Sequence, residues 1–235
     1  MHRYQKVYQD LLDKIMSGAL APGMVLPAEL ELARSYQVSR PTIRHALQML
    51  QSEGLVERRK RRGTMVLEPK MEQGFATSIR SFHDEMQSLN RIPRTDVLAC
   101  SVEPADAHVA DRLGLGEGDP VMRLVRVRYA DDLPNVLVRT YVPHVLYPGI
   151  ETTDFTEASL YATMRLMASP VIHAHRTLDV ALADREIAQA LRIEPSSPVF
   201  VFHTVAQNAS GQCAEYSIAT YRGDTNSFEF DTQLE

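Results

Sequence analysis

The sequence predicts an α+β protein with two domains, a small helical domain that ends in a hairpin and a larger domain built on an antiparallel sheet. The hydrophobic pattern leads to this prediction, because it changes from a helical period to alternating, strand-like runs near residue 75. The length of 235 residues suits two modest domains, and 44% hydrophobic and 23% charged residues are typical of a globular chain. Charge is also divided unevenly between the two parts.

Three helices are expected in the first domain. The first is indicated by apolar residues every four positions, at Val7, Leu11 and Ile15. Pro27 begins a short second helix, and Ser39 is the expected N-cap of the third, with a proline in its first turn. The buried face of the third helix is expected at Ile43, Ala46, Leu47 and Leu50.

A basic hairpin is expected after these helices. Two β-prone runs, 55–58 and 64–67, flank the loop Arg59-Lys60-Arg61-Arg62-Gly63. Helix, tight turn, helix and basic hairpin, in this order, are typical of a winged helix-turn-helix domain. Its third helix enters the major groove and its hairpin lies along the phosphates. The residues expected to contact double-stranded operator DNA are Ser39, Arg40, Thr42, Arg44, His45, Arg59, Lys60, Arg61, Arg62, Gly63 and Thr64.

The charge distribution favours the same interpretation. Residues 1–70 hold 12 Lys and Arg against 7 Asp and Glu, whereas the rest of the chain holds 13 against 23, within a net charge of −5. A basic end on an acidic remainder suggests that this end meets a polyanion. The alternative is a solvated basic surface without a role in nucleic-acid binding.

The second domain is expected over residues 75–235, after a winged helix-turn-helix domain at 1–67 and a linker at 68–74. Short turns between its strands imply antiparallel pairing. Strands are expected at 95–102, 121–129, 136–142, 171–182, 199–207 and 214–221. Helices are expected at 76–89, 105–113, 157–167 and 184–191.

The apolar runs and the cysteines of the sequence indicate the cellular compartment of the protein. No apolar run approaches the roughly 18 residues that a membrane helix needs. Two cysteines, Cys100 and Cys213, neither build a disulfide framework nor match a zinc motif. We therefore expect a protein of the reducing cytoplasm, associated with the nucleoid when bound to its operator, without membrane contact, metal or cofactor.

Several motifs carry a resemblance to a known family. Leu26-Pro27-Ala28-Glu29, the run 38–44 and the segments around Gly54 and Gly63 resemble the GntR superfamily of bacterial transcription regulators. Arg112-Leu113-Gly114-Leu115, Arg139-Thr140-Tyr141 and Tyr221-Arg222-Gly223 resemble the effector-binding UTRA domain of its HutC-like, histidine-utilisation-repressor branch. The resemblance implies a homodimeric, effector-responsive and usually repressing protein, whose second domain is similar in fold to chorismate lyase.

The sequence departs from the family pattern at two positions. Leu30 stands where the family often has a DNA-contacting arginine, so one contact is expected to be weaker or redirected. Val138 stands where relatives that sense sugar phosphates usually carry glutamate, which argues against a hexosamine phosphate as the effector.

Strand alternation predicts an anion pocket in the second domain. Arg126 and Arg128 end an otherwise apolar strand face, and a small anionic effector would satisfy them; pairing with acidic residues or solvent is the alternative. Glu215, Tyr221 and Ser159 resemble ligand-contacting positions of the family, and Ser81 and Phe82 are further candidates. His173 and His175 face the same way on one strand, but no third metal ligand is placed.

A regulator released from its operator by a small anionic metabolite is the function that fits these features. Two alternatives remain open from the sequence. One is an enzyme of lyase-like fold fused to a DNA-binding domain, although no catalytic arrangement emerges with informative spacing. The other is an architectural DNA-binding protein without an effector.

Overall fold

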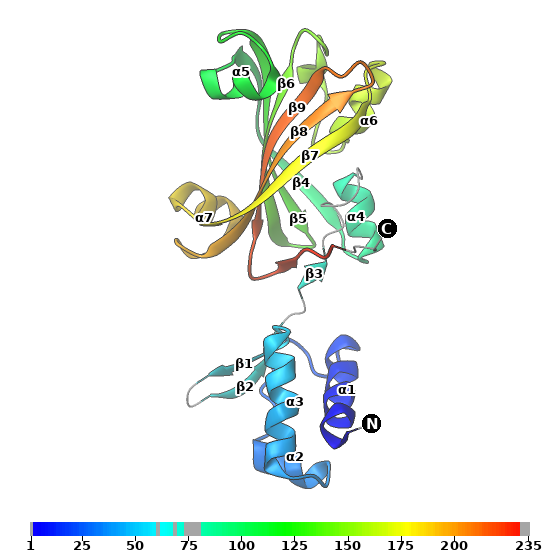
Figure 1. The fold of residues 1–235 in the computed structure, drawn as a ribbon, viewed down its shortest axis with the longest axis vertical. Coiled ribbons are helices and arrows are strands. Elements are labelled where there is room, and N and C mark those ends of the chain that lie inside the picture. Colours follow the sequence, from blue (N-terminus) through cyan, green and yellow to red (C-terminus); the bar gives the residue numbers. More distant parts are fainter. Residues whose placement is uncertain (1, 60–61, 68–69, 73–80, 231–235) are drawn as a thin grey trace, which may run out of the picture. The chain divides into compact units, whose positions relative to one another are not determined.

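The computed structural model describes residues 2–59, 62–67, 70–72 and 81–230, and the chain divides into two compact units, Met1–Lys70 and Met71–Glu235 (Figure 1). The first unit holds α1 (Arg3–Met16), α2 (Glu29–Ser35), α3 (Arg40–Ser52), β1 (Val56–Arg59) and β2 (Gly63–Val66). Its core contains the predicted stripe of α1 and the predicted face of α3, all buried. The three predicted helices and the two strands of the hairpin are thus confirmed, although α2 begins at Glu29 and not at Pro27.

The turn between α2 and α3 is tight. Gln37 adopts a left-handed conformation with φ 53°, and the Val38 amide donates to the Ala33 carbonyl at 3.0 Å. Ser39 then caps α3, its hydroxyl accepting the Thr42 amide at 3.4 Å, as predicted. This turn sets the angle at which α3 leaves α2.

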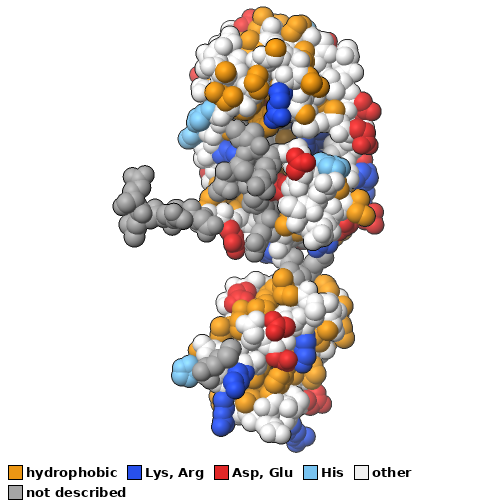
Figure 2. Space-filling model, turned by 90° about the vertical axis from the view of Figure 1, so that its right-hand side faces the viewer, with side chains coloured by type: hydrophobic (Ala, Val, Ile, Leu, Met, Phe, Trp, Pro, Cys, Tyr) orange, Lys and Arg blue, Asp and Glu red, His pale blue; other side chains and the backbone are white. Residues whose placement is uncertain are grey.

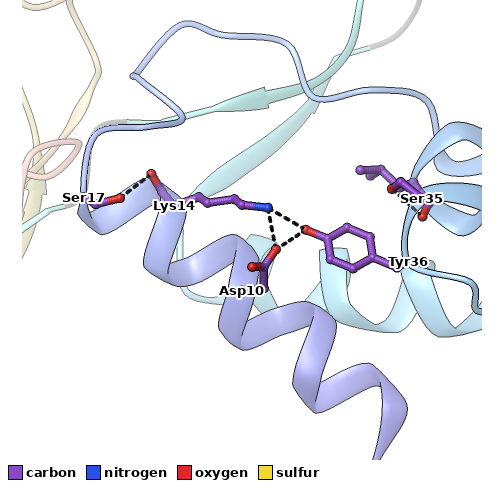
Figure 3. Close-up of polar contacts among 6 residues, drawn as sticks. Asp10, Lys14, Ser17, Ser35 and Tyr36 are labelled. Carbon is purple, nitrogen blue, oxygen red and sulfur yellow. Dashed lines mark hydrogen bonds and ion pairs between the residues drawn. The ribbon is translucent and has the colours of Figure 1, made fainter.

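Polar contacts hold α1 against its neighbours. Asp10 accepts hydrogen bonds from Lys14, at 2.7 Å, and from the Tyr36 hydroxyl at the end of α2 (Figure 3). These two donors lower the pKa of Asp10 below its ordinary value. At α3, the Tyr8 hydroxyl donates to Glu53 at 2.7 Å, which raises the pKa of Tyr8 to about 12.

The second unit is built on a six-stranded antiparallel sheet in the order β4-β5-β6-β9-β8-β7. Each predicted strand is present, and β7 has the predicted bounds. The strands are β4 (Pro93–Pro104), β5 (Pro120–Ala130), β6 (Leu133–Pro143), β7 (Val171–Leu182), β8 (Pro198–Asn208) and β9 (Cys213–Arg222).

Helices cover both faces of this sheet. On one face, α4 (Phe82–Ser88) and α6 (Leu160–Leu166) pack over apolar residues that include Met122, Leu124 and Phe202. On the other face, α5 (Ala107–Leu113) and α7 (Arg185–Leu191) pack over the alternate residues, among them Val121 and Val125. The short η2 helix (Ile150–Thr152) lies in the connection after β6. This alternation is what places two arginines of β5 on the face of α4 and α6.

Two predictions differ from the structure near the start of this unit. Met71 and Glu72 form β3, paired in parallel with β10 (Asn226–Ser227), so this part of the predicted 68–74 linker is a strand of the second unit. The helix predicted over 76–89 is α4, Phe82–Ser88, in the described part of the chain; residues 76–80 lie outside it.

Candidate functional site

Three arginines of the first unit converge on one carboxylate. Arg44 of α3 donates to Glu29 Oε2 at 3.1 Å, and the Arg40 guanidinium, one turn earlier, lies 4.0 Å from the same oxygen. Arg58, on β1, donates to Glu29 Oε1. Glu29 is the first residue of α2 and its side chain is 19% exposed, whereas Arg40 and Arg44 remain more than half exposed. Helix α3 and the hairpin are therefore joined in one basic surface.

Glu29 organises this surface and was missed as a functional residue by sequence reasoning. The hydrogen bond from Arg44 is the main cause that lowers the pKa of Glu29, opposed by burial and assisted by the charges of Arg44, Arg58 and Arg40. In the sequence, Glu29 ends the family motif at residues 26–29 and is an acidic residue in the first turn of a helix, where it suits the helix dipole. Nothing local shows that an arginine 29 positions later meets it.

Other predicted DNA-contacting residues interact with neighbouring side chains of the same unit. Ser39 and Thr42 share a hydroxyl hydrogen bond of 2.8 Å at the start of α3. The His45 ring stacks on Tyr4 of α1, with 4.2 Å between ring centroids. Arg59 donates to Glu57 at 2.7 Å.

The tip of the hairpin is exposed where the structure describes it. Arg62 and Gly63 are exposed and Thr64 is partly so, whereas Lys60 and Arg61 lie outside the described residues. Gly63 has φ 89°, and a Cβ there would lie 3.0 Å from Val25, so the turn requires glycine. Blue Lys and Arg side chains project from the surface of the first unit (Figure 2). Leu30, the departure from the family pattern, is 45% exposed on α2.

A cavity of about 210 Å³ lies in the second unit, between the sheet and the segments of α4 and α6. All five predicted effector-contacting residues line it, and so do Ser81 and Phe82. From the sheet come Arg126, Arg128, Glu215, Ser217 and Tyr221; from the helical side come Glu85, Ser159 and Tyr161. Ser159 is the N-cap of α6 and accepts the Ala162 amide at 3.4 Å.

The electrostatic centre of the cavity is Arg126, which is 3% exposed. Its Nε and Nη1 have no hydrogen-bond partner among the described residues, and neither has Nε of Arg128. Burial, and next the neighbouring charge of Arg128, lower the pKa of Arg126 well below its ordinary value; Glu215 acts in the opposite direction. The Arg126 and Arg128 guanidinium carbons lie 5.8 Å from the Phe155 ring and 5.2 Å from the Phe82 ring, respectively.

Two carboxylates and a tyrosine complete the polar lining. Glu215 and Glu85 are 5% and 6% exposed, and Glu215 Oε2 has no hydrogen-bond partner among the described residues. The pKa of Tyr161 is raised, first by burial and then by the nearby charge of Glu215. The pKa of Tyr221 is also raised, chiefly by burial.

Sequence reasoning missed Glu85, Tyr161 and Arg176 as members of this polar group. Arg176 comes from β7, and its proximity opposes the rise in the pKa of Tyr161. Alternation along β7 predicts its face, but the neighbouring residues come from other elements. The hydroxyls of Thr140, Ser217 and Thr204 were missed too; they form a buried row across β6, β9 and β8, in direct register.

No cluster of three or more His, Cys, Asp or Glu side chains suited to a metal occurs in the described part of the chain. His173 and His175 lie exposed on β7. Over the described ranges, no helix is long and apolar enough to span a membrane.

Family models match both units. The model of the bacterial regulatory proteins of the gntR family matches residues 3–66, and the UTRA domain model matches residues 88–226. The chain belongs to the GntR family of transcriptional regulators, with a UTRA domain. Regulators of this kind bind operator DNA and small-molecule effectors, the latter through the UTRA domain.

Individual relatives agree with this assignment. The chain is 31% identical to the HTH-type transcriptional repressor NagR of Bacillus subtilis over 96% of this chain and 92% of NagR. It is 31% identical to the histidine utilization repressor of Pseudomonas aeruginosa over 83% of this chain and 77% of that protein. The crystal structure of PhnF from Mycobacterium smegmatis superposes with a TM-score of 0.76 at 32% identity, covering 97% and 100% of the two chains.

The comparisons decide between the functional alternatives. Both family models identify the chain as a GntR regulator, as predicted. The predicted α+β architecture, a winged helix-turn-helix domain followed by an antiparallel-sheet domain, is also confirmed. The relatives are transcriptional regulators, and nothing among them supports a lyase-like enzyme fused to a DNA-binding domain.

Proposed function

We propose that this regulator is a homodimeric repressor that leaves its operator when a small anionic metabolite occupies the cavity of the UTRA domain. The observation that carries the proposal is the buried guanidinium of Arg126, which lies on the cavity wall with two nitrogens unbonded among the described residues. On this proposal it acts in the cytoplasm, on the nucleoid.

The energetics favour an anion at Arg126. A buried, uncompensated charge costs several kcal/mol, and a carboxylate or phosphate recovers that cost through paired, charge-assisted hydrogen bonds. Val138 supports this argument, because it lies directly across from Arg126 in the β5–β6 register and lines the cavity. A glutamate there would supply the negative charge itself; with valine, the ligand supplies it.

The rest of the cavity narrows the effector class. Glu85 and Glu215 lie on its walls and repel a second anionic group, but they accept hydrogen bonds from hydroxyl or amine donors. Ser159 and Tyr221 also line the cavity, and each adds a hydroxyl group. We therefore propose a small metabolite with one carboxylate or phosphate and with hydroxyl or amine groups, and not a hexosamine phosphate.

The first unit supplies the operator-binding part of the proposal. Arg44 reads a base edge from the first turns of α3, Arg40 and the hairpin residues contact phosphates, and Ser39, Thr42 and His45 lie on the same helix start. One such head covers only a few base pairs, so two copies on an inverted repeat provide the needed specificity. Relatives named as repressors, including NagR and the histidine utilization repressor, support repression as the outcome.

A ligand screen tests the proposal. The effector-free full chain is titrated in a thermal-shift assay with inorganic phosphate, citrate, amino acids, glucosamine 6-phosphate and neutral glucose. We expect a stabilising anion that also lowers affinity for the operator selected from random DNA, and no shift with Arg126→Ala. A neutral effector, or a normal response of Arg126→Ala, would contradict the anion site; operator binding without any responsive ligand would contradict the repressor mechanism.

A further inference from the structure

The outer strand β7 is an unprotected sheet edge. It pairs only with β8 within the described sheet, and none of its twelve residues is buried. It carries apolar side chains that face solvent, with Ile172 60%, Val180 70% and Leu182 66% exposed. Proteins normally protect long apolar edges, because such edges pair with other strands. In Figure 1, β7 is the long yellow strand.

The strand at the opposite edge of the sheet, β4, has features that protect an edge from pairing. It begins and ends with proline, and its pairing is interrupted by a bulge between Val97 and Ala99. Its ends also carry ion pairs, Arg94 with Asp96 and Glu103 with Arg123. β7 has no proline, and its bulge lies at its first residues, between Val171 and His173. The remaining ten residues of β7 form an uninterrupted edge.

The sequence of β7 is complementary to itself when it is read in reverse. Residues opposite each other in an antiparallel pair lie on the same face, so a symmetric pair must place one residue opposite its own copy. The strand centre falls between Arg176 and Thr177. Centring on Arg176 would place two arginines opposite each other, whereas centring on Thr177 places His175 opposite Asp179 of the partner subunit.

The register centred on Thr177 also matches the apolar face. It sets Ile172 opposite Leu182 of the partner subunit and Ala174 opposite Val180 of the partner subunit. Each of these pairs occurs twice because of the two-fold symmetry. The one acidic residue of the strand thus meets a histidine, and the most exposed apolar residues meet each other.

We infer that two copies of this chain pair through β7, antiparallel and centred on Thr177, to extend the sheet across the dimer. The inference rests on the homodimer of the proposed function and names its interface. It also gives His173 and His175 a place in the molecule, as edge residues facing a second copy rather than as metal ligands.

Charge exchange tests the pairing. In the full chain, His175→Glu places a carboxylate opposite Asp179 of the partner subunit twice per dimer, and the dimer dissociation constant from analytical ultracentrifugation should rise at least tenfold. Adding Asp179→Lys should restore it to within threefold of the unsubstituted chain. Both positions are exposed, so the fold is expected to remain intact, which circular dichroism verifies.

Cross-linking tests the register. Directly opposed residues of an antiparallel pair lie about 5 Å apart at Cα, which suits a disulfide. Thr177→Cys should therefore give a covalent dimer under mild oxidation. The matched control Ala181→Cys is also exposed and lies on the same face, but it lies about 27 Å from its own copy in this register and should stay uncross-linked. The unsubstituted chain controls for Cys100 and Cys213.

The outcomes separate this inference from the proposed function. A dimer that forms normally with His175→Glu, or that leaves Thr177→Cys uncross-linked, overturns the β7 interface and leaves the homodimer standing. A chain that is monomeric at micromolar concentration and still binds its operator tightly overturns both. Dissociation by His175→Glu, rescue by Asp179→Lys and selective cross-linking at position 177 support the inference.

Discussion

Replacing Arg126 by methionine should stabilise the effector-free protein while removing its response to the effector. The guanidinium is 3% exposed, has two unbonded nitrogens among the described residues and lies beside the like charge of Arg128. Replacing a buried ion pair by well-packed apolar side chains is often neutral or stabilising by about 1–4 kcal/mol, because desolvation of the charges is costly; the same desolvation cost falls on Arg126, and we expect a gain within this range. For a unit of this size, each kcal/mol corresponds to about 2–4 °C in melting temperature.

Differential scanning calorimetry of the effector-free full chain measures this effect. Arg123→Met is the matched control, because Arg123 lies on the same strand, faces the other way and pairs loosely with Glu103 at 3.8 Å. The control should change stability by less than about 1 kcal/mol, as expected for an exposed pair. A loss of stability in Arg126→Met, with the control unchanged, would show that Arg126 is well compensated without a ligand and would refute the anion argument.

Four further predictions concern DNA binding and its coupling to the effector. Arg44→Ala should cost about 1–3 kcal/mol on the selected operator and little on random DNA in fluorescence anisotropy; equal losses would exclude base reading. Glu29→Gln should lower the ratio of specific to non-specific affinity, because it releases Arg44 and Arg58, whereas Asp13→Asn on α1, with the same charge change, should not. Folding lowers the pKa of Glu29, so the ionised carboxylate stabilises the folded state. This stabilisation is complete above pH 4.5 and is lost as the pH falls through the pKa of Glu29 in the folded protein. In Glu29→Gln, the free energy of unfolding should lose this contribution to its acid dependence. Operator DNA should weaken effector binding in calorimetry by the same factor as the effector weakens operator binding, and effector binding that operator DNA leaves unchanged would contradict release by the effector.

Much of the fold is predictable because local patterns dominate it. The period-four stripe of α1 and the capping serine of α3 are signals within one helix, and both are confirmed. The alternation along β5 also predicts correctly that Arg126 and Arg128 share a face, since a strand admits no other arrangement of side chains. For the same reason, the predicted strands differ from the observed ones by only a few residues at their ends.

The contacts that join separate elements are not predictable in this way. Glu29 meets arginines 11, 15 and 29 positions later, and Glu85 reaches the cavity from α4, which is far in sequence from β5 and β9. Each of these residues is an ordinary charged side chain in its own segment. Glu29 meets its arginines only because of the angle between α2 and α3, and Glu85 reaches the cavity only because α4 packs on the sheet.

Arg176 links the proposed effector site to the proposed dimer interface. It lies at the centre of β7, next to Thr177, and it acts on the pKa of Tyr161, as does Glu215 on the cavity wall. On the proposed interface, Leu178 of the partner subunit lies directly opposite Arg176. We expect an anion in the cavity to change the electrostatic balance around Glu215 and Tyr161, and with it the position of Arg176. If both proposals hold, such a shift reaches the dimer edge through Arg176, and linkage then requires that dimer pairing alter effector affinity by the same factor as the effector alters pairing.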